Sequence, residues 1–342
     1  MTYQQLIQHL QNGVFAPVYL LCGTESYYID LASDWIENNV LDEMAKAFDQ
    51  TVLYGKDLRG EDIAQAVDLA RGMAMMGGKR VVLVKEAQTV RKWDALALYL
   101  KNPQPNTLFV LCYKYGTPDK RLALWKDFEK QGGIIMLSDK MKDYQVEGWV
   151  SDYLNTRAKA DGHDLNISPK VPGLLAAYIG NDLTTIIGAV DKLIAGLPEG
   201  QNTIDEQHVE RNIGISKDYN VFELQDAIIK GDILRANRIV RYFAGSKDHP
   251  MIKEMGILYT FFANLLIYLY LPDKNERVAA PILGVSPFYI KDYKLAAERF
   301  TKGKVFRIIG YFRDTDARLK GINNPSAKDE DLWKELIYKI LH

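Results

Sequence analysis

Five short apolar runs in the first 140 residues constrain the fold of this chain most. They cover Val18 to Cys22, Thr51 to Tyr54, Arg80 to Lys85, Leu108 to Tyr113 and Ile134 to Leu137. Segments of helix length separate most of these runs. Strands that alternate with helices form a largely parallel sheet that helices cover on both faces. The sequence therefore predicts an α/β domain over residues 1–139.

Helical patterns replace the strand patterns from about Asp139 onward. In the segment NDLTTIIGAVDKLI, residues 181–194, the apolar side chains repeat at the spacing of one buried helix face. The polar segment GISKDYN, Gly214 to Asn220, marks a second boundary. These patterns predict a small helical domain over residues 140–213 and an all-α C-terminal domain over residues 214–342.

The composition describes a globular chain without an obvious partner. Its 342 residues exceed what one hydrophobic core usually serves, and its net charge of -1 gives no general attraction to nucleic acid or to an anionic membrane. Cys22 and Cys112 lie in apolar runs and are expected to be core residues in a reducing compartment. The apolar segment Gly256 to Leu271 is shorter than the roughly 20 residues of a membrane span, so we expect a buried helix and a cytoplasmic protein.

The first apolar run continues into a glycine turn and a helix, VYLLCGTESYYID, which is the layout of many phosphate-binding folds. A phosphate loop of the form GxxxxGK[ST] needs a second glycine and a lysine, and both are missing after Gly23. Glu25 would also place a negative charge where a phosphate would lie. The sequence therefore disfavours nucleotide binding at this turn.

Other catalytic patterns are also missing from the sequence. In the strand RVVLVKEAQ, Lys85 takes the position of the aspartate that holds Mg²⁺ in nucleotide-hydrolysing domains, which leaves Glu86 alone. No zinc-binding spacing and no GxSxG motif occurs. The five histidines are scattered: His9, His163, His208, His249 and His342. We expect no catalytic residue, no cofactor and no metal site.

The helix before that strand presents two unexplained methionines. At about 100° per residue, one arc of the helix gathers six apolar side chains. They are Ile63, Ala66, Val67, Ala70, Met73 and Ala74. Met75 and Met76 fall on the opposite side, just before a Gly-Gly helix stop. Either the helix ends one residue early and both methionines pack under the next strand, or they form an apolar plug for a partner's pocket, which the adaptable methionine side chain suits.

Five segments in series resemble the delta subunit of the bacterial DNA polymerase III clamp loader. They are PVYLLCGTESYYID, ARGMAMMGGKRVVLVKEAQ, GNDLTTIIGAVDKL, NVFELQDAIIKGD and GVSPFYIKDYKLAAERF. Their order and spacing match the family over nearly the whole chain. The resemblance implies an AAA+-like α/β domain without a nucleotide site, a small helical lid and a C-terminal collar domain. Asn181, Asp182 and Leu183 stand where an active relative presents an arginine to phosphate.

The resemblance also implies a function and a site. The family's delta subunit opens the ring-shaped sliding clamp with two adjacent apolar residues, which match Met75 and Met76, although leucine or phenylalanine is frequent there. The implied partners are the sliding clamp (beta subunit), loader subunits of the gamma/tau and delta-prime types, and primer-template DNA. ATP would be hydrolysed by sister subunits. The alternatives are an AAA+ ATPase with a degenerate phosphate loop and a stand-alone DNA-binding protein.

Two basic groups are candidates for DNA contact within an assembled loader. The first is the loop with Lys114, Tyr115, Lys120 and Arg121, and the second is a C-terminal cluster of Lys302, Lys304, Arg307 and Arg313. A solvated helical face is the favoured explanation of either group, and phosphate contact within the assembled loader is the alternative. Tyr289 and Tyr293 are four residues apart and are expected to pack in the C-terminal domain.

Overall fold

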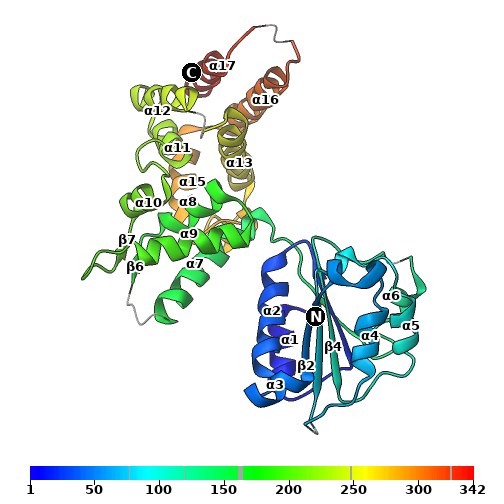
Figure 1. Cartoon of the computed structure of the whole chain (residues 1–342). Coiled ribbons are helices and arrows are strands. Elements are labelled where there is room, and N and C mark those ends of the chain that lie inside the picture. The colour runs from blue at the N-terminus through cyan, green and yellow to red at the C-terminus, as the bar shows by residue number, and fades with distance from the viewer. Residues whose placement is uncertain (77, 120, 161–164, 247–248, 324–325) are drawn as a thin grey trace. The chain divides into compact units, whose positions relative to one another are not determined.

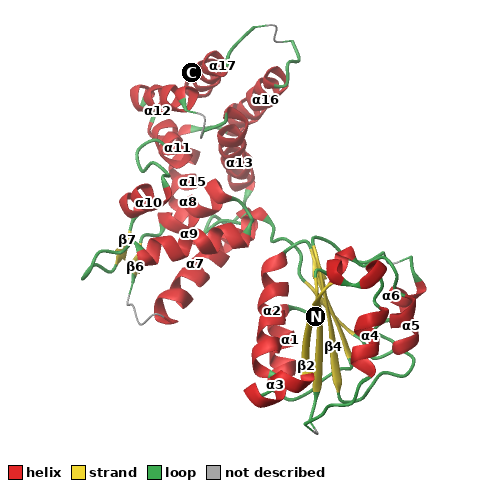
Figure 2. Cartoon of the chain, viewed as in Figure 1, coloured by secondary structure: helices red, strands yellow, loops and turns green. Residues whose placement is uncertain are grey.

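A computed structural model describes residues 1–76, 78–119, 121–160, 165–246, 249–323 and 326–342. Its internal contacts divide the chain into two compact units. The N-terminal unit holds residues 1–141 with 182–184, and the C-terminal unit holds residues 142–181 with 185–342. Figure 2 shows that the N-terminal unit contains a sheet between helices and that the C-terminal unit is mainly helical.

The sheet of the N-terminal unit has the strand order β2-β3-β4-β1-β5, and all its pairings are parallel. The strands are β1 (Val18–Gly23), β2 (Gln50–Tyr54), β3 (Arg80–Lys85), β4 (Thr107–Lys114) and β5 (Ile134–Leu137). The predicted parallel α/β fold is therefore confirmed, with each strand within one residue of its expected bounds at either end. Because the strands are parallel, the turn after β1 lies at the carboxyl edge of the sheet, between the ends of β4 and β5.

Helices cover both faces of this sheet (Figure 1). One face carries α1 (Tyr3–Gln11), α2 (Ser26–Asn39) and α3 (Glu43–Asp49), and the other carries α4 (Ala64–Arg71), α5 (Asp94–Tyr99) and α6 (Ala123–Asp127). Short 3-10 turns, η1 (Gly55–Asp57), η2 (Arg59–Glu61) and η3 (Ala87–Thr89), connect the strands. Alternate strand residues enter two separate cores, so Cys22 and Cys112 lie on opposite faces of the sheet. Both cysteines are buried, as predicted.

The C-terminal unit is built from helices and one pair of two-residue strands. Its helices are α7 (Asp143–Ala160), α8 (Lys170–Ile179), α9 (Leu183–Ala195), α10 (Glu206–Ile213), α11 (Val221–Lys230), α12 (Ile233–Gly245), α13 (Met251–Tyr270), α14 (Glu276–Leu283), α15 (Ile290–Arg299), α16 (Lys302–Leu319) and α17 (Asp329–Leu341), with the 3-10 turn η4 (Pro287–Tyr289). The short strands β6 (Asn166–Ile167) and β7 (Thr203–Ile204) pair in parallel and were not predicted. The predicted helical character of this half of the chain is confirmed.

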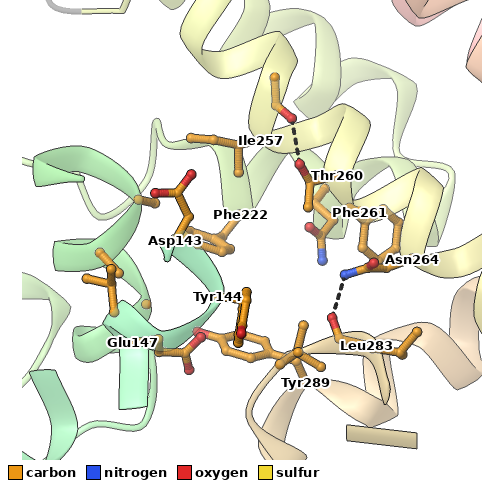
Figure 3. Close-up of a pocket in the computed structure, with 18 of the residues that line it drawn as sticks. Asp143, Tyr144, Glu147, Phe222, Ile257, Thr260, Phe261, Asn264, Leu283 and Tyr289 are labelled. Atoms are coloured by element: carbon orange, nitrogen blue, oxygen red, sulfur yellow. Dashed lines mark hydrogen bonds between the residues drawn. The ribbon is translucent and has the colours of Figure 1, made fainter. Parts of the chain in front are cut away.

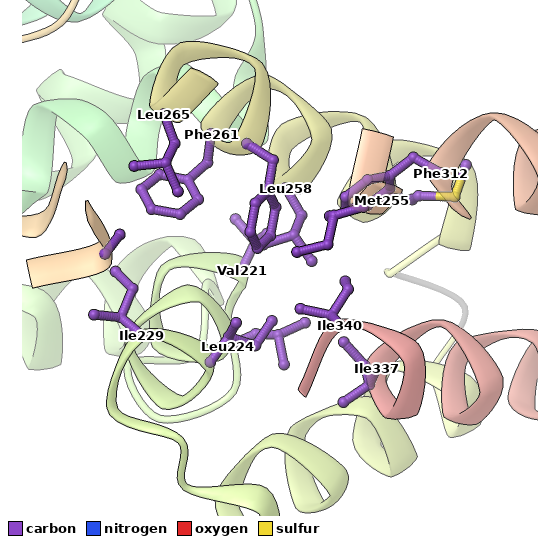
Figure 4. Close-up of a cluster of buried hydrophobic side chains, with 14 of the residues drawn as sticks. Val221, Leu224, Ile229, Met255, Leu258, Phe261, Leu265, Phe312, Ile337 and Ile340 are labelled. Atoms are coloured by element: carbon purple, nitrogen blue, oxygen red, sulfur yellow. The ribbon is translucent and has the colours of Figure 1, made fainter. Parts of the chain in front are cut away.

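One hydrophobic core joins helices α11 to α17 (Figure 4). Helix α13 is at its centre, with Leu258, Phe262 and Leu265 fully buried. Among the described residues, α13 is the one helix that is long and apolar enough to cross a membrane. The prediction of a buried helix holds for one of its faces, while the other exposes Ile252 and Tyr259. A helix that supplies this much of a packed core is explained as part of a globular fold.

Candidate functional site

Helix α4 ends earlier than the sequence predicts. Its last residue is Arg71, and Gly72 already has extended backbone angles. The buried arc is confirmed for Ala66, Val67 and Ala70. It is wrong for Met73, which is 77% exposed, because a helical wheel no longer describes a side chain that lies beyond the helix end.

Met75 and Met76 lie in the turn between α4 and β3, which we call the methionine turn. Met75 is 72% exposed and Met76 is 49% exposed, so neither side chain packs under the following strand. The interpretation of both methionines as core residues is therefore wrong. Their use as a plug in a partner's pocket stays a prediction.

The backbone of this turn is fixed by one buried carboxylate. Asp49, the last residue of α3, is fully buried. Its Oδ1 accepts the N–H of Met75 at 2.7 Å, and its Oδ2 accepts the N–H of Met76 at 2.9 Å. Hydrogen bonds to an ionised acceptor are stronger than those between neutral groups. The turn is thus held by its backbone while the two methionine side chains remain in solvent.

A second contact fixes the start of the same turn. The guanidinium Nη1 of Arg80, at the start of β3, donates to the carbonyl oxygen of Met73 at 3.1 Å. Neither the role of Asp49 nor this role of Arg80 was predicted from the sequence. Asp49 is 26 residues from Met75 in the chain, so no local pattern could connect them.

Helix α3 presents further apolar side chains beside its anchoring residue. Met44 and Phe48 are four residues apart on this helix and both are exposed. Residues at this spacing share a helix face. The exposure of Met44 and Phe48, on the helix that ends at the anchoring Asp49, was not predicted from the sequence.

The glycine turn after β1 is filled by the chain itself. Gly23 has φ +143°, and a Cβ there would lie 1.9 Å from the carbonyl oxygen of Ser138. Glu25 is 4% exposed and caps α2, its Oε1 accepting the N–H of Tyr27 at 2.9 Å. N–H groups at a helix start are the usual ligands of a bound phosphate. Here the carboxylate of Glu25 takes that position, which agrees with the expected effect of its charge.

Two lysines stand at the carboxyl edge of the sheet and pair with helix α2. Lys85 Nζ lies 2.8 Å from Glu37 and 3.4 Å from Asp34. Burial alone would lower the pKa of Lys85, but these two carboxylates outweigh it and the pKa is raised. Lys114 Nζ lies 2.6 Å from Asp30. In the parts of the chain that the structure describes, no three potential ligands gather to hold a metal ion.

The candidate DNA contacts of the first basic loop have local partners. Besides Lys114 with Asp30, Arg121 pairs with Asp119 at 2.7 Å and lowers the pKa of Asp119 to about 2. Tyr115 is exposed, and Lys120 lies outside the described residues. DNA contact at this loop stays a prediction.

The second basic group also has neighbours. Lys302 Nζ lies 4.0 Å from the ring centre of Tyr270, and Arg313 pairs with Asp314 at 2.9 Å. Lys304 donates to the carbonyl oxygen of Lys339, and burial followed by the charges of Arg307 and Arg299 lowers its pKa. DNA contact here is likewise untested. The expected packing role of Tyr293 is confirmed by its burial, and Tyr289 packs against the same core.

Comparison with known proteins finds sequence similarity to a bacterial DNA polymerase subunit. Residues 19–137 match the family model described as DNA polymerase III, delta subunit. The chain is 25% identical over 340 residues to DNA polymerase III subunit delta of Bacillus subtilis (strain 168), with 96% of this chain and 93% of the relative covered. These matches confirm the resemblance that the sequence motifs indicated.

Solved structures with a similar course of the chain include two bacterial proteins. The DNA clamp loader delta protein of Bacillus subtilis is 23% identical, with 99% of each chain covered and a TM-score of 0.47. The RuvB Holliday junction branch migration motor of Thermotoga maritima is 13% identical, with 86% of this chain and 83% of that chain covered and a TM-score of 0.40.

Proposed function

We propose that this chain, which resembles the DNA polymerase III delta subunit family, is a clamp-loader subunit that performs no catalysis itself and that binds and opens the sliding clamp. The observation that carries the proposal is the turn at Met75 and Met76, where two exposed apolar side chains are held by a buried carboxylate. Its working environment is the cytoplasm, during DNA replication. Its partners are the beta-type clamp, loader subunits of the gamma/tau and delta-prime types, and primer-template DNA in the assembled loader.

Two methionines are enough to dominate a small interface. Fully burying one large apolar side chain contributes roughly 1.5–3 kcal/mol, so the pair supplies roughly 3–6 kcal/mol before the costs of association. A backbone that is already fixed by Asp49 and Arg80 reduces the entropy lost on binding. The adaptable thioether side chain fills an irregular pocket, which compensates for the leucine or phenylalanine frequent in the family.

Binding of the turn opens the clamp ring if the clamp conformation that binds it cannot form a closed ring. A ligand shifts an equilibrium only by its differential affinity for the two states. The turn would therefore bind the open conformation more tightly than the closed one, and the difference would offset the loss of a contact between clamp subunits. ATP-dependent changes in sister subunits would decide when the turn is accessible.

A clamp labelled with a fluorophore pair across one subunit interface tests this function. When the full-length chain is added without other loader subunits, the two fluorophores should move apart. The variant with Met75→Ala and Met76→Ala should leave their separation unchanged. A variant with Leu98→Ala and Leu122→Ala removes two other exposed apolar side chains of the N-terminal unit and should open the ring normally. If the methionine variant opened the ring over the same range of protein concentration as the wild type, the proposed plug would be excluded.

The competing function is an AAA+ ATPase with a degenerate phosphate loop. The position of the Glu25 carboxylate at the start of α2 and the pairing of Lys85 with Glu37 both favour the non-catalytic subunit. Calorimetric titration with Mg·ATP distinguishes the two functions, because micromolar affinity would support the ATPase. A stand-alone DNA-binding protein would instead bind duplex DNA tightly at physiological salt.

A further inference from the structure

The C-terminal unit contains a cavity of about 690 Å³, whose lining is drawn in Figure 3. Its lining residues come from α7, α8, α11, α13, the end of α14, η4 and α15. Aromatic rings supply much of the lining, including those of Tyr144, Phe222, Phe261, Tyr289 and Tyr293. Its size is within the range of ligand-binding sites, roughly 300–1,000 Å³.

One carboxylate in this cavity lacks a partner. Glu147 is only partly exposed, and Figure 3 shows its side chain reaching toward the ring of Tyr289. Within the described ranges, Glu147 makes no hydrogen bond or ion pair. Burial raises the pKa of Glu147 to about 7. An ionised carboxylate in such a place favours a cationic ligand, because pairing offsets the loss of hydration.

The other charged groups of the cavity are already engaged. Asp143 accepts a hydrogen bond from Asn181 Nδ2 at 3.3 Å. Lys253 Nζ donates to the carbonyl oxygen of Tyr178 at 2.7 Å. The other polar groups of the lining include the hydroxyls of Tyr289 and Tyr293, whose pKa values are raised by burial. Of the two carboxylates that line this cavity, Glu147 is the one without a hydrogen-bond partner among the described residues.

A second cavity of about 700 Å³ adjoins the first. Tyr144, Glu147, Gly284 and Val285 line both cavities, so the unpaired carboxylate borders both, and we call the two cavities together a groove. The second part is lined by Asp152 and by uncharged groups such as Ser151, Asn155 and Pro287. A single small amine would fill only part of this length, whereas an extended polypeptide segment would use all of it.

We propose that this groove, named the Glu147 groove, binds a segment of a partner polypeptide that places an arginine or lysine side chain against Glu147 and the rings of Tyr144 and Tyr289. Carboxylates and aromatic faces both attract such cations, and a guanidinium also stacks on aromatic rings. The groove lies in the other unit from the methionine turn, so the inference does not depend on clamp binding.

The test uses the full-length chain and capped pentapeptides with a central arginine or its neutral isostere citrulline. The probe signal is the methyl resonance of Ile257, which lines the cavity, with that of the buried Ile29 in the N-terminal unit as internal control. The arginine peptide should shift Ile257 saturably with roughly millimolar affinity. The citrulline peptide should bind at least about tenfold more weakly, because it lacks the charge.

Variants and a smaller probe complete the experiment. Glu147→Gln should remove the preference for arginine over citrulline, and Glu298→Gln, the same change at an exposed position of the same unit, should keep it. Butylguanidinium should bind more weakly than the peptide if the groove holds a chain segment. No saturable shift, equal binding of both peptides, an unchanged preference in Glu147→Gln, or equal binding of butylguanidinium and peptide would each overturn the proposal.

Discussion

Two carboxylates of this chain meet opposite environments. Asp49 is buried, and each of its oxygens accepts a backbone N–H of the methionine turn. Glu147 is largely buried and, in the described part of the chain, has no such partner. Hydrogen bonds compensate for the burial of a charge, and their absence leaves the cost of desolvation in place. Asp49 therefore stabilises the fold, whereas ionised Glu147 destabilises it.

For Asp49, removal of the side chain should cost both stability and binding. We expect Asp49→Ala to lower the free energy of unfolding by about 2–3 kcal/mol, because two charge-assisted hydrogen bonds are lost. Asp49→Asn keeps an acceptor and should lie between Asp49→Ala and wild type. Urea denaturation measures both variants, with the exposed Asp57→Ala as control. An Asp49→Ala variant as stable as Asp57→Ala would contradict the anchoring role.

The effect of Glu147 depends on pH. Its pKa is raised to about 7 in the folded chain, so the folded state holds this proton more tightly than the unfolded state does. The wild type should therefore lose stability as the pH rises from about 4.5 to above 7, and Glu147→Gln should not. At pH 8 we expect Glu147→Gln to be more stable by about 1–2 kcal/mol, a value reduced for partial solvent exposure.

Denaturation in urea at pH 5 and at pH 8 checks this expectation. The two proteins should differ little at the lower pH, and Glu298→Gln should follow the wild type at both. A constant difference between wild type and Glu147→Gln across this range would show that ionisation of Glu147 does not penalise the fold.

At the scale of elements, the connection from β1 to α2 keeps the outline of a phosphate loop and closes it with protein atoms. Gly23 permits the close approach of Ser138, and Glu25 caps the helix. The sequence predicted that the charge of Glu25 opposes phosphate binding, because the missing lysine and the carboxylate can both be read from neighbouring residues. It did not predict that α4 ends at Arg71, because a helical wheel assumes that the helix continues.

The close approach at Gly23 can be tested directly. Gly23→Ala should lower the free energy of unfolding by about 3 kcal/mol or more, since a Cβ would lie 1.9 Å from a backbone oxygen at a φ that side chains rarely adopt. Gly188→Ala in the middle of α9 meets no atom within 4 Å and should instead stabilise by roughly 0.5–1 kcal/mol. Thermal unfolding followed by circular dichroism measures both. Equal effects of the two substitutions would contradict the packing around Gly23.

At the scale of the whole molecule, a feature can be predicted from the sequence when the residues that form it are close together along the chain. The strands of the sheet and the apolar stripe of α9 follow from neighbouring residues and were predicted. Asp49 beneath Met75 and the Glu147 groove between α7 and α13 depend on segments brought together by the fold. The family resemblance indicated the role of Met75 and Met76 but not what holds them.

The central claim is that Met75 and Met76 bind the sliding clamp. Surface plasmon resonance on an immobilised clamp measures it most directly, with wild type compared with the Met75→Ala, Met76→Ala double variant. We expect at least about a hundredfold loss of affinity, from about 3 kcal/mol or more of lost apolar burial, and an unchanged circular dichroism spectrum. The Leu98→Ala, Leu122→Ala variant should bind like wild type. Wild-type affinity in the folded methionine variant would contradict the account.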